Sequence, residues 1–136
     1  MKNKTLILLR HIPGSGSSFT GKILSENGKY PVLATDDYFM INGEYKFDKT
    51  KLHHYHQLCL QDTEKEMIKE TEKIFITNTF TREKELDSYI ELSKKYDYNL
   101  ISLIVENRHG NKNIHNVPEK NINKMEIRLL NSIKLK

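Results

Sequence analysis

The sequence contains a single cysteine, Cys59, and no long apolar run. One thiol excludes an internal disulfide and fits a reducing compartment, so we expect a cytoplasmic protein. The longest apolar run, at residues 6–9, is far shorter than the roughly 20 residues that a transmembrane helix needs. The N-terminus, MKNKTLILLR, begins with positive charge but has no small-residue cleavage site, which favours a strand over a signal peptide. We therefore expect no membrane partner.

A strong excess of charge of one sign is also absent. The chain carries 22 Lys and Arg against 18 Asp and Glu, a formal net charge of +4. This excess favours an anionic partner but does not by itself indicate nucleic acid. With 136 residues, 37% hydrophobic and 29% charged, the sequence predicts one folded domain over residues 1–136.

Short apolar stretches alternate with longer periodic ones. Four stretches rich in Ile, Leu and Val predict short buried strands at residues 6–9, 31–35, 73–77 and 100–105. Helical spacing of apolar residues predicts helices at residues 17–27, 51–71, 82–96 and 117–133. Alternating strands and helices indicate an α/β fold whose mostly parallel sheet is covered on both faces. Ligands in such folds bind at the C-terminal ends of the strands.

The first strand leads into a glycine-serine stretch that resembles a phosphate-binding loop. Residues 6–22 read LILLRHIPGSGSSFTGK, against the pattern G-x-x-x-x-G-K-[ST]. Gly14 and Gly16 allow backbone N–H groups to converge on one anion, and the following helix start favours phosphate. A hydroxyl of Ser17 or Ser18 is also a candidate Mg²⁺ ligand. A plain turn that joins strand to helix accounts for the stretch equally well, whereas a dinucleotide fingerprint lacks its third glycine.

Two carboxylates follow the second predicted strand directly. Asp36 and Asp37 come after Thr35, at a strand end that we expect to lie near the loop. Asp36 there is placed to accept a proton from an attacking hydroxyl or to hold Mg²⁺ through water. The structural alternative is a helix cap or a turn, which is the commoner reason for an Asp-Asp pair after a strand.

Together the two segments resemble the polynucleotide-kinase-like branch of P-loop kinases, which includes phage 5′-hydroxyl polynucleotide kinase domains and proteins often labelled AAA-family ATPases. The resemblance continues through TDDYFMINGEYKFDKTKL, with the family's G-x-Y-x-F-D, and through YHQLCL. It extends over ITNTFTREKELDSYIELSKKYDYNL to the lid-like stretch VENRHGNKNIHNVPEKNINKMEIRL, and so covers essentially the whole chain in order. It implies a three-layer P-loop kinase-like fold.

The resemblance also implies ligands and roles. ATP or GTP would bind with Mg²⁺ in the loop, and the acceptor would be a nucleic acid 5′-hydroxyl or a similar hydroxyl. Asp36 matches the general base, Arg108 or Lys112 matches a basic lid contact, and Asn78 and Thr79 would lie beside the site. Many relatives carry Asp where this chain has Thr77. The residues that match the family's nucleotide-binding segment are Pro13, Gly14, Ser15, Gly16, Ser17 and Ser18. The metal ligands that the resemblance implies are Ser17, Ser18 and Asp36.

The loop departs from the family at two positions: His11 stands where a glycine is expected, and no lysine follows Gly16. A one-residue deletion that aligns Ser17 with the family's serine fits the helix better than a substitution of lysine by Ser17. Loss of one preorganised donor from a transition state costs roughly 10²–10³ in rate, whereas backbone N–H groups and Mg²⁺ still support nucleotide binding. Two hypotheses follow, a weakened or altered kinase and an inactive pseudokinase that binds nucleotide, nucleic acid or protein. The sequence predicts no particular oligomeric state.

Overall fold

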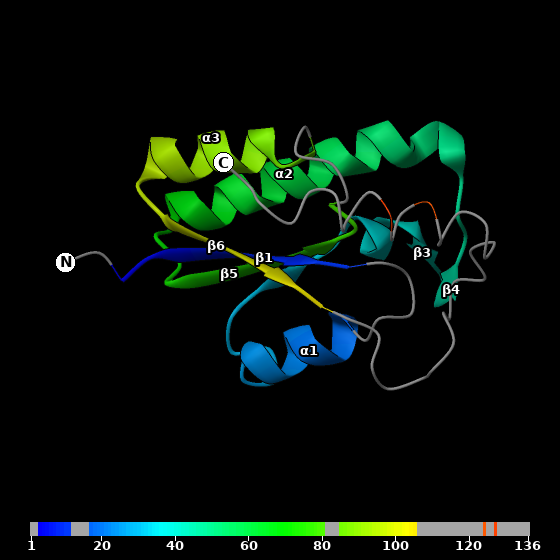
Figure 1. The fold of residues 1–136 in the computed structure, drawn as a ribbon. Coiled ribbons are helices and arrows are strands. Elements are labelled where there is room, and N and C mark those ends of the chain that lie inside the picture. The colour runs from blue at the N-terminus through cyan, green and yellow to red at the C-terminus, as the bar shows by residue number, and fades with distance from the viewer. Residues whose placement is uncertain (1–2, 12–16, 81–84, 106–123, 125–126, 128–136) are drawn as a thin grey trace.

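The computed structural model describes residues 3–11, 17–80, 85–105, 124 and 127, with the backbone alone for residues 17–19 (Figure 1). The predicted lid and last helix, which include Arg108 and Lys112, fall outside these residues apart from Lys124 and Ile127. The loop residues Pro13, Gly14, Ser15 and Gly16 also fall outside them.

A four-stranded sheet forms the middle layer of the fold. Its strands are β1 (Thr5–Arg10), β2 (Val32–Leu33), β5 (Lys73–Asn78) and β6 (Asn99–Ile104), in the order β2-β5-β1-β6. Every neighbouring pair is parallel, with β1 between β5 and β6. The prediction of a parallel sheet from these four stretches is confirmed.

Helices cover both faces of the sheet, which gives three layers (Figure 1). Helix α1 (Ser17–Leu24) lies on one face, and α2 (Leu52–Ile68) and α3 (Asp87–Tyr96) lie on the other. Three of the four predicted helices are confirmed, and each is shorter than expected. Helix α1 ends at Leu24 because Glu26 and Asn27, with φ of 56° and 58°, and then Gly28 take left-handed backbone conformations.

Each face of the sheet has its own apolar core. The alternation of side chains along a strand sends Leu6 and Leu8 to one face and Ile7 and Leu9 to the other. The core beneath α2 and α3 includes Leu6, Leu8, Cys59, Met67, Ile74, Ile76, Leu86 and Tyr89. The core beneath α1 is smaller and centres on Ile7, Leu9 and Phe75.

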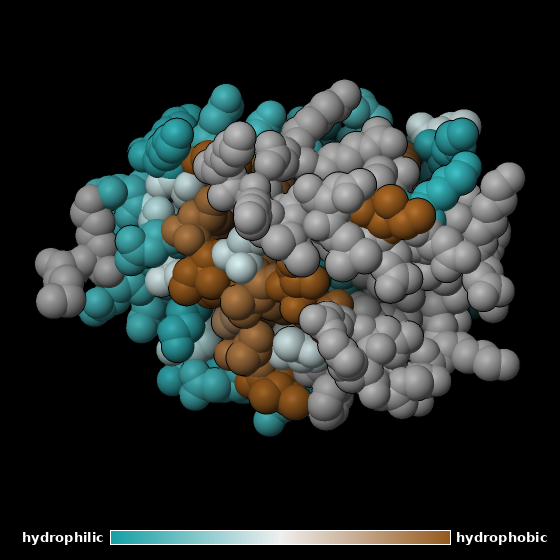
Figure 2. Space-filling model, viewed as in Figure 1, coloured by the Kyte–Doolittle hydropathy of each residue, from teal (hydrophilic) through white to brown (hydrophobic). Residues whose placement is uncertain are grey.

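Strand β6 is less buried than the sequence predicts. Ile101 and Leu103 are 45% and 42% exposed, because β6 lies at the edge of the sheet while α1 packs on β1 and β5. Ile23 and Leu24 of α1 are exposed as well. Figure 2 shows an apolar surface that runs over β6 and α1. An apolar run alone does not reveal whether its strand is central or at an edge, which is why the prediction of a buried strand is wrong here.

A short hairpin, which we did not predict, follows the second strand. Strands β3 (Met40–Ile41) and β4 (Glu44–Tyr45) are antiparallel and are joined by Asn42 and Gly43, with φ of 53° and 81°. Asn-Gly is the strongest short hairpin signal because both residues tolerate positive φ. The signal was therefore present in the sequence.

The core accounts for the stability of the sheet, so truncation of a buried strand residue is its direct test. Leu8 has no exposed surface, and Leu8→Ala should lower the free energy of unfolding by about 2–5 kcal/mol. Ile68→Ala is the matched control, because Ile68 is 63% exposed and its truncation should change stability by less than about 0.5 kcal/mol. Urea unfolding measures both, and equal losses would contradict the assignment of the core.

Candidate functional site

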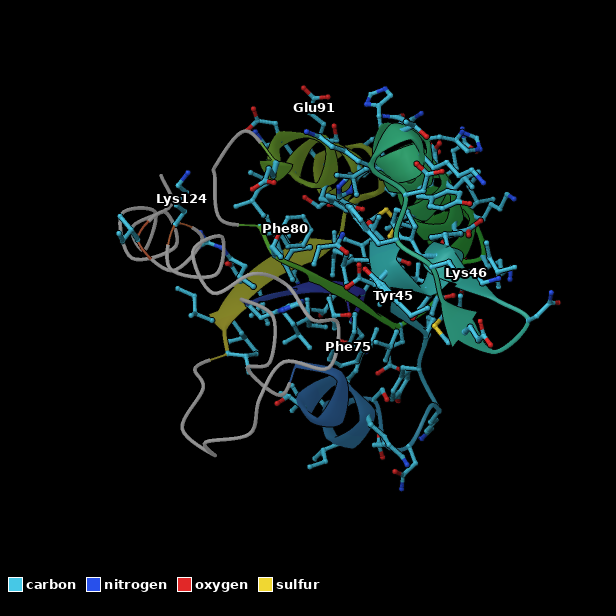
Figure 3. All side chains as sticks on the ribbon, turned by 90° about the vertical axis from the view of Figure 1, so that its right-hand side faces the viewer. Tyr45, Lys46, Phe75, Phe80, Glu91 and Lys124 are labelled. Atoms are coloured by element: carbon cyan, nitrogen blue, oxygen red, sulfur yellow. The ribbon has the colours of Figure 1, made fainter. Side chains whose placement is uncertain are left out.

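The parallel register brings three strand ends to one edge of the sheet. Arg10 of β1 pairs with Asn78 of β5 and with Ile104 of β6. Figure 3 looks onto this edge, with α1 and the α2–α3 layer on opposite sides of the strands. The predicted phosphate loop joins this end of β1 to the N-terminus of α1, so its two attachment points lie where a ligand is expected.

Helix α1 starts at Ser17 and lies close against the sheet at Gly21. A Cβ on Gly21 would meet Val32 Cγ1 at 3.3 Å and Thr77 Cγ2 at 3.5 Å. Ser17 and Ser18 occupy the first turn of this helix, where backbone N–H groups without intrahelical partners favour an anion. Their predicted roles toward nucleotide and Mg²⁺ stay predictions.

The turn that carries Asp36 is tied to the end of β5. Residues Thr35–Phe39 form a 3₁₀ turn directly after β2. The backbone N–H of Thr35 donates to Asn78 Oδ1 at 2.9 Å, and this bond is buried. Because a backbone donor requires an oxygen acceptor, the bond also fixes which way round the Asn78 amide lies. Asp36 therefore follows a residue whose backbone is held at the ligand-binding edge.

Tyr45 of the hairpin reaches the carboxylate of Asp36. Its hydroxyl donates to Asp36 Oδ1 at 3.3 Å. Burial, together with the charge of Asp36 and this hydrogen bond, raises the pKa of Tyr45 to about 12. The hydroxyl thus stays protonated at neutral pH and remains a donor. We did not predict this role for Tyr45, although the G-x-Y-x-F-D resemblance had marked the residue.

His56 of α2 contacts the same turn from the other side. Its Nδ1 lies 3.0 Å from the hydroxyl Oγ1 of Thr35. Partial burial of the ring lowers the pKa of His56, and the carboxylates of Glu85 and Asp36 oppose this shift. The ring otherwise faces solvent, since the residue is exposed. Three elements, β5, β4 and α2, therefore contact residues Thr35 and Asp36.

The end of β1 carries two buried polar residues, Arg10 and His11, which are 1% and 8% exposed. Arg10 Nε donates to the carbonyl oxygen of Phe80 at 3.1 Å. Phe80 has φ of 42°, an uncommon conformation for a bulky residue. The guanidinium therefore stabilises the backbone just beyond β5, next to Asn78 and Thr79.

The aromatic residues of the turn divide between packing and hydrogen bonding. Phe39 has no exposed surface, so it packs in the interior and is unavailable for stacking with a base. The hydroxyl of Tyr38 donates to Asp62 Oδ2 of α2, and burial together with this bond raises the pKa of Tyr38.

Comparison with known proteins gives relatives by sequence and by structure. No family model matches the chain. It is 34% identical over 128 residues to human NEDD4-binding protein 2, a match that covers 88% of this chain and only 7% of that protein. A chain of the Pnkp1/Rnl/Hen1 RNA repair complex matches with a TM-score of 0.75 at 14% identity, over 98% of this chain and 46% of that one.

A second solved structure, a gluconokinase from Sinorhizobium meliloti, matches with a TM-score of 0.58 at 12% identity, over 95% of this chain and 77% of that one. These likenesses show that the fold is P-loop kinase-like, as the sequence predicted. No helix among the described residues is long and apolar enough to cross a membrane.

The contact between His56 and Thr35 predicts a pH dependence of stability. Because the pKa of folded His56 is lowered, the unfolded chain takes up a proton more readily as the pH falls through its ordinary value of 6.5. The free energy of unfolding should therefore fall between pH 7.5 and pH 5.5, and the loss should level off below the folded pKa. His56→Asn, which keeps a polar atom near Nδ1 but does not titrate, should reduce this fall in urea unfolding. An unchanged fall would contradict the shift.

Proposed function

We propose that this chain binds ATP or GTP with Mg²⁺ in the loop Pro13–Ser18 and transfers the γ-phosphoryl group, slowly, to a hydroxyl acceptor. The observation that supports this most is the hydrogen bond from Thr35 N–H to Asn78 Oδ1, at 2.9 Å. It holds Asp36 at the sheet edge where the predicted loop leaves β1. In this proposal Asp36 would face the acceptor, and the N-terminus of α1 would face the phosphates of the nucleotide.

Asp36 would act as the general base. Its carboxylate accepts the proton of the attacking hydroxyl while the new P–O bond forms and the bond to the nucleoside diphosphate breaks. The Tyr45 hydroxyl donates a hydrogen bond to Asp36 Oδ1 and thereby orients the carboxylate. Hydroxyls of Ser17 or Ser18, together with Asp36, would hold Mg²⁺, which supplies neutralising charge at the transferred phosphate. Their place in the first turn of α1 fits such a site.

The acceptor we propose is a nucleic acid 5′-hydroxyl, within the polynucleotide-kinase-like branch. Three findings support it: the match to Pnkp1 of an RNA repair complex, the motif resemblance, and the net charge of +4. Arg108 and Lys112 would contact the transferred phosphates from the lid. The single thiol, Cys59, is buried and free, which fits a cytoplasmic location.

The missing lysine favours a second candidate, a pseudokinase that binds without transfer. No lysine follows Gly16, so the loop lacks the phosphate-binding ammonium that the family carries there. A hydrogen bond to a charged group contributes about 1.5–3 kcal/mol, which nucleotide binding can lose and still persist. The rate of phosphoryl transfer falls more than nucleotide affinity does when a donor that stabilises the transition state is lost. Both the weakened kinase and the pseudokinase would therefore bind nucleotide, and they would differ in the rate of phosphoryl transfer.

Restoring the lysine of the loop distinguishes the weakened kinase from the pseudokinase. A Lys inserted between Gly16 and Ser17 restores both the length and the charge of the loop, so transfer to a 5′-hydroxyl oligonucleotide should rise by roughly 10²–10³. Ser17→Lys should help less, because it leaves the helix one residue short in register. Labelled-phosphate transfer from ATP measures the rates.

Asp36→Asn in the insertion variant is the matched control, since it keeps the shape of the side chain and removes the proton acceptor. It should abolish the gain in the rate of transfer. An insertion variant that binds ATP but transfers to no 5′-hydroxyl oligonucleotide would leave the pseudokinase as the better account. An unmodified protein that is already fast would show that the lysine is dispensable here.

A further inference from the structure

The hairpin and the segment after it present an apolar surface to solvent beside the candidate site. Phe47 is 58% exposed, and Met40 and Ile41 are 48% and 38% exposed. They belong to the hairpin β3–β4 and the residues that follow it, which lie beside the strand ends in Figure 3. Three large apolar side chains are thus exposed within eight residues of the sequence, and an apolar patch on a protein surface marks a candidate binding site.

The ring of Phe47 is held in place by its contacts with other aromatic rings. Its centroid lies 5.1 Å from that of Phe39, at an interplanar angle of 36°. Phe39 is fully buried and packs edge-on against Tyr55 at 4.6 Å. The backbone N–H of Lys46 donates to the carbonyl of Phe39 at 2.8 Å, which ties the end of the hairpin to the turn. Phe47 is therefore a positioned ring with a large exposed area.

Phe47 is connected to Asp36 through two ring contacts. Phe39 contacts Phe47 on one side and Tyr45 on the other, the latter at 6.1 Å between centroids and 71° between planes. The hydroxyl of Tyr45 then donates to Asp36 Oδ1. Phe47 and Asp36 therefore belong to one connected group of side chains.

The charges around Phe47 suit a polyanion. Lys46, Lys49 and Lys51 are exposed and flank the ring in sequence. Asp48, the acidic residue next to Phe47, accepts hydrogen bonds from the backbone N–H and the hydroxyl of Thr50, at 2.9 Å and 2.6 Å. Glu44 lies 3.9 Å from Lys46, at the far limit of an ion pair. Three exposed ammonium groups therefore lie within four residues of Phe47 in the sequence.

We propose that Phe47 is a stacking platform for a nucleobase of a single-stranded nucleic acid, with Lys46, Lys49 and Lys51 contacting its phosphates. This assignment rests on the proposed function, because it places the 5′ end of that strand at Asp36. Stacking on an aromatic ring is tolerant of base identity, so the surface selects a single strand with accessible bases and no particular sequence. Phosphate contacts add affinity that falls as salt rises.

Binding of a fluorescein-labelled 5′-hydroxyl single-stranded oligonucleotide, followed by anisotropy without ATP, tests the platform. Phe47→Ala should weaken binding about five- to a hundredfold, as expected for one lost stacking contact. Phe47→Trp should retain the affinity, because it keeps a stacking face. Ile68→Ala, which removes an equally exposed apolar side chain near the end of α2, should change affinity less than twofold. The double variant Lys49→Ala/Lys51→Ala should reduce the dependence of affinity on salt.

An abasic oligonucleotide separates stacking from a general effect on folding. It should bind wild-type protein and Phe47→Ala equally; a loss in Phe47→Ala of the same size for abasic and normal strands would overturn the platform. Equal affinity of wild-type protein and Phe47→Ala for the normal strand would overturn it too. If the wild-type protein binds no oligonucleotide, the proposal is wrong, and a protein partner becomes the better candidate ligand of the apolar surface.

The same measurements distinguish this inference from the proposed function. Phe47-dependent binding without phosphoryl transfer, in both the wild-type protein and the lysine-insertion variant, would support the platform and contradict the kinase. Phosphoryl transfer together with an oligonucleotide affinity that Phe47→Ala does not change would support the kinase and contradict the platform.

Discussion

The hydrogen bond between Thr35 N–H and Asn78 Oδ1 is the constraint on which the candidate site depends. Strand β2 contains only two residues, so its pairing with β5 alone holds the following turn weakly. The buried bond extends this attachment past the end of the strand, and loss of its acceptor would leave a buried N–H unsatisfied, at about 1–3 kcal/mol. Because β5 is itself paired along its whole length with β1, the position of Asp36 is fixed relative to the strand that enters the loop.

Elements packed around this turn complete its support from both sides. Tyr45 contacts Asp36 from the hairpin, and His56 contacts Thr35 from α2. Polar groups held by partners on separate elements keep their geometry without the substrate, which is what a preorganised site requires. The hairpin also connects the turn to Phe47 through Phe39, so one rigid aromatic group serves both the carboxylate and the exposed surface.

The sequence predicted the layers of the fold because strand and helix periodicity are local properties. Residues 6–9 and 74–76 are apolar throughout, and both lie in buried strands in the middle of the sheet. Exposure of Ile101 and Leu103 was not predictable in this way, since edge position depends on strand order. The hairpin was missed despite Asn42-Gly43 because its strands are only two residues long.

Prediction of the site was more uneven. The motif resemblance indicated Asp36 and Asn78. In the structure the residue before Asp36, Thr35, donates a backbone hydrogen bond to Asn78. The contacts of Tyr45 and His56 depend on how the hairpin and α2 fold back on the turn, which no spacing in the sequence encodes. Arg108, Lys112 and the loop residues 13–16 lie outside the described residues, so their roles stay predictions.

Titration of the unmodified protein with ATP and Mg²⁺ by calorimetry tests the central claim, that a loop without its lysine still binds nucleotide, most directly. The account predicts a saturable isotherm with one nucleotide per chain, which weakens when Mg²⁺ is chelated. A dissociation constant tighter than about 1 mM corresponds to more than roughly 4 kcal/mol of binding free energy, which backbone N–H groups and the metal can supply. Absence of saturable binding at millimolar ATP and GTP would contradict the account.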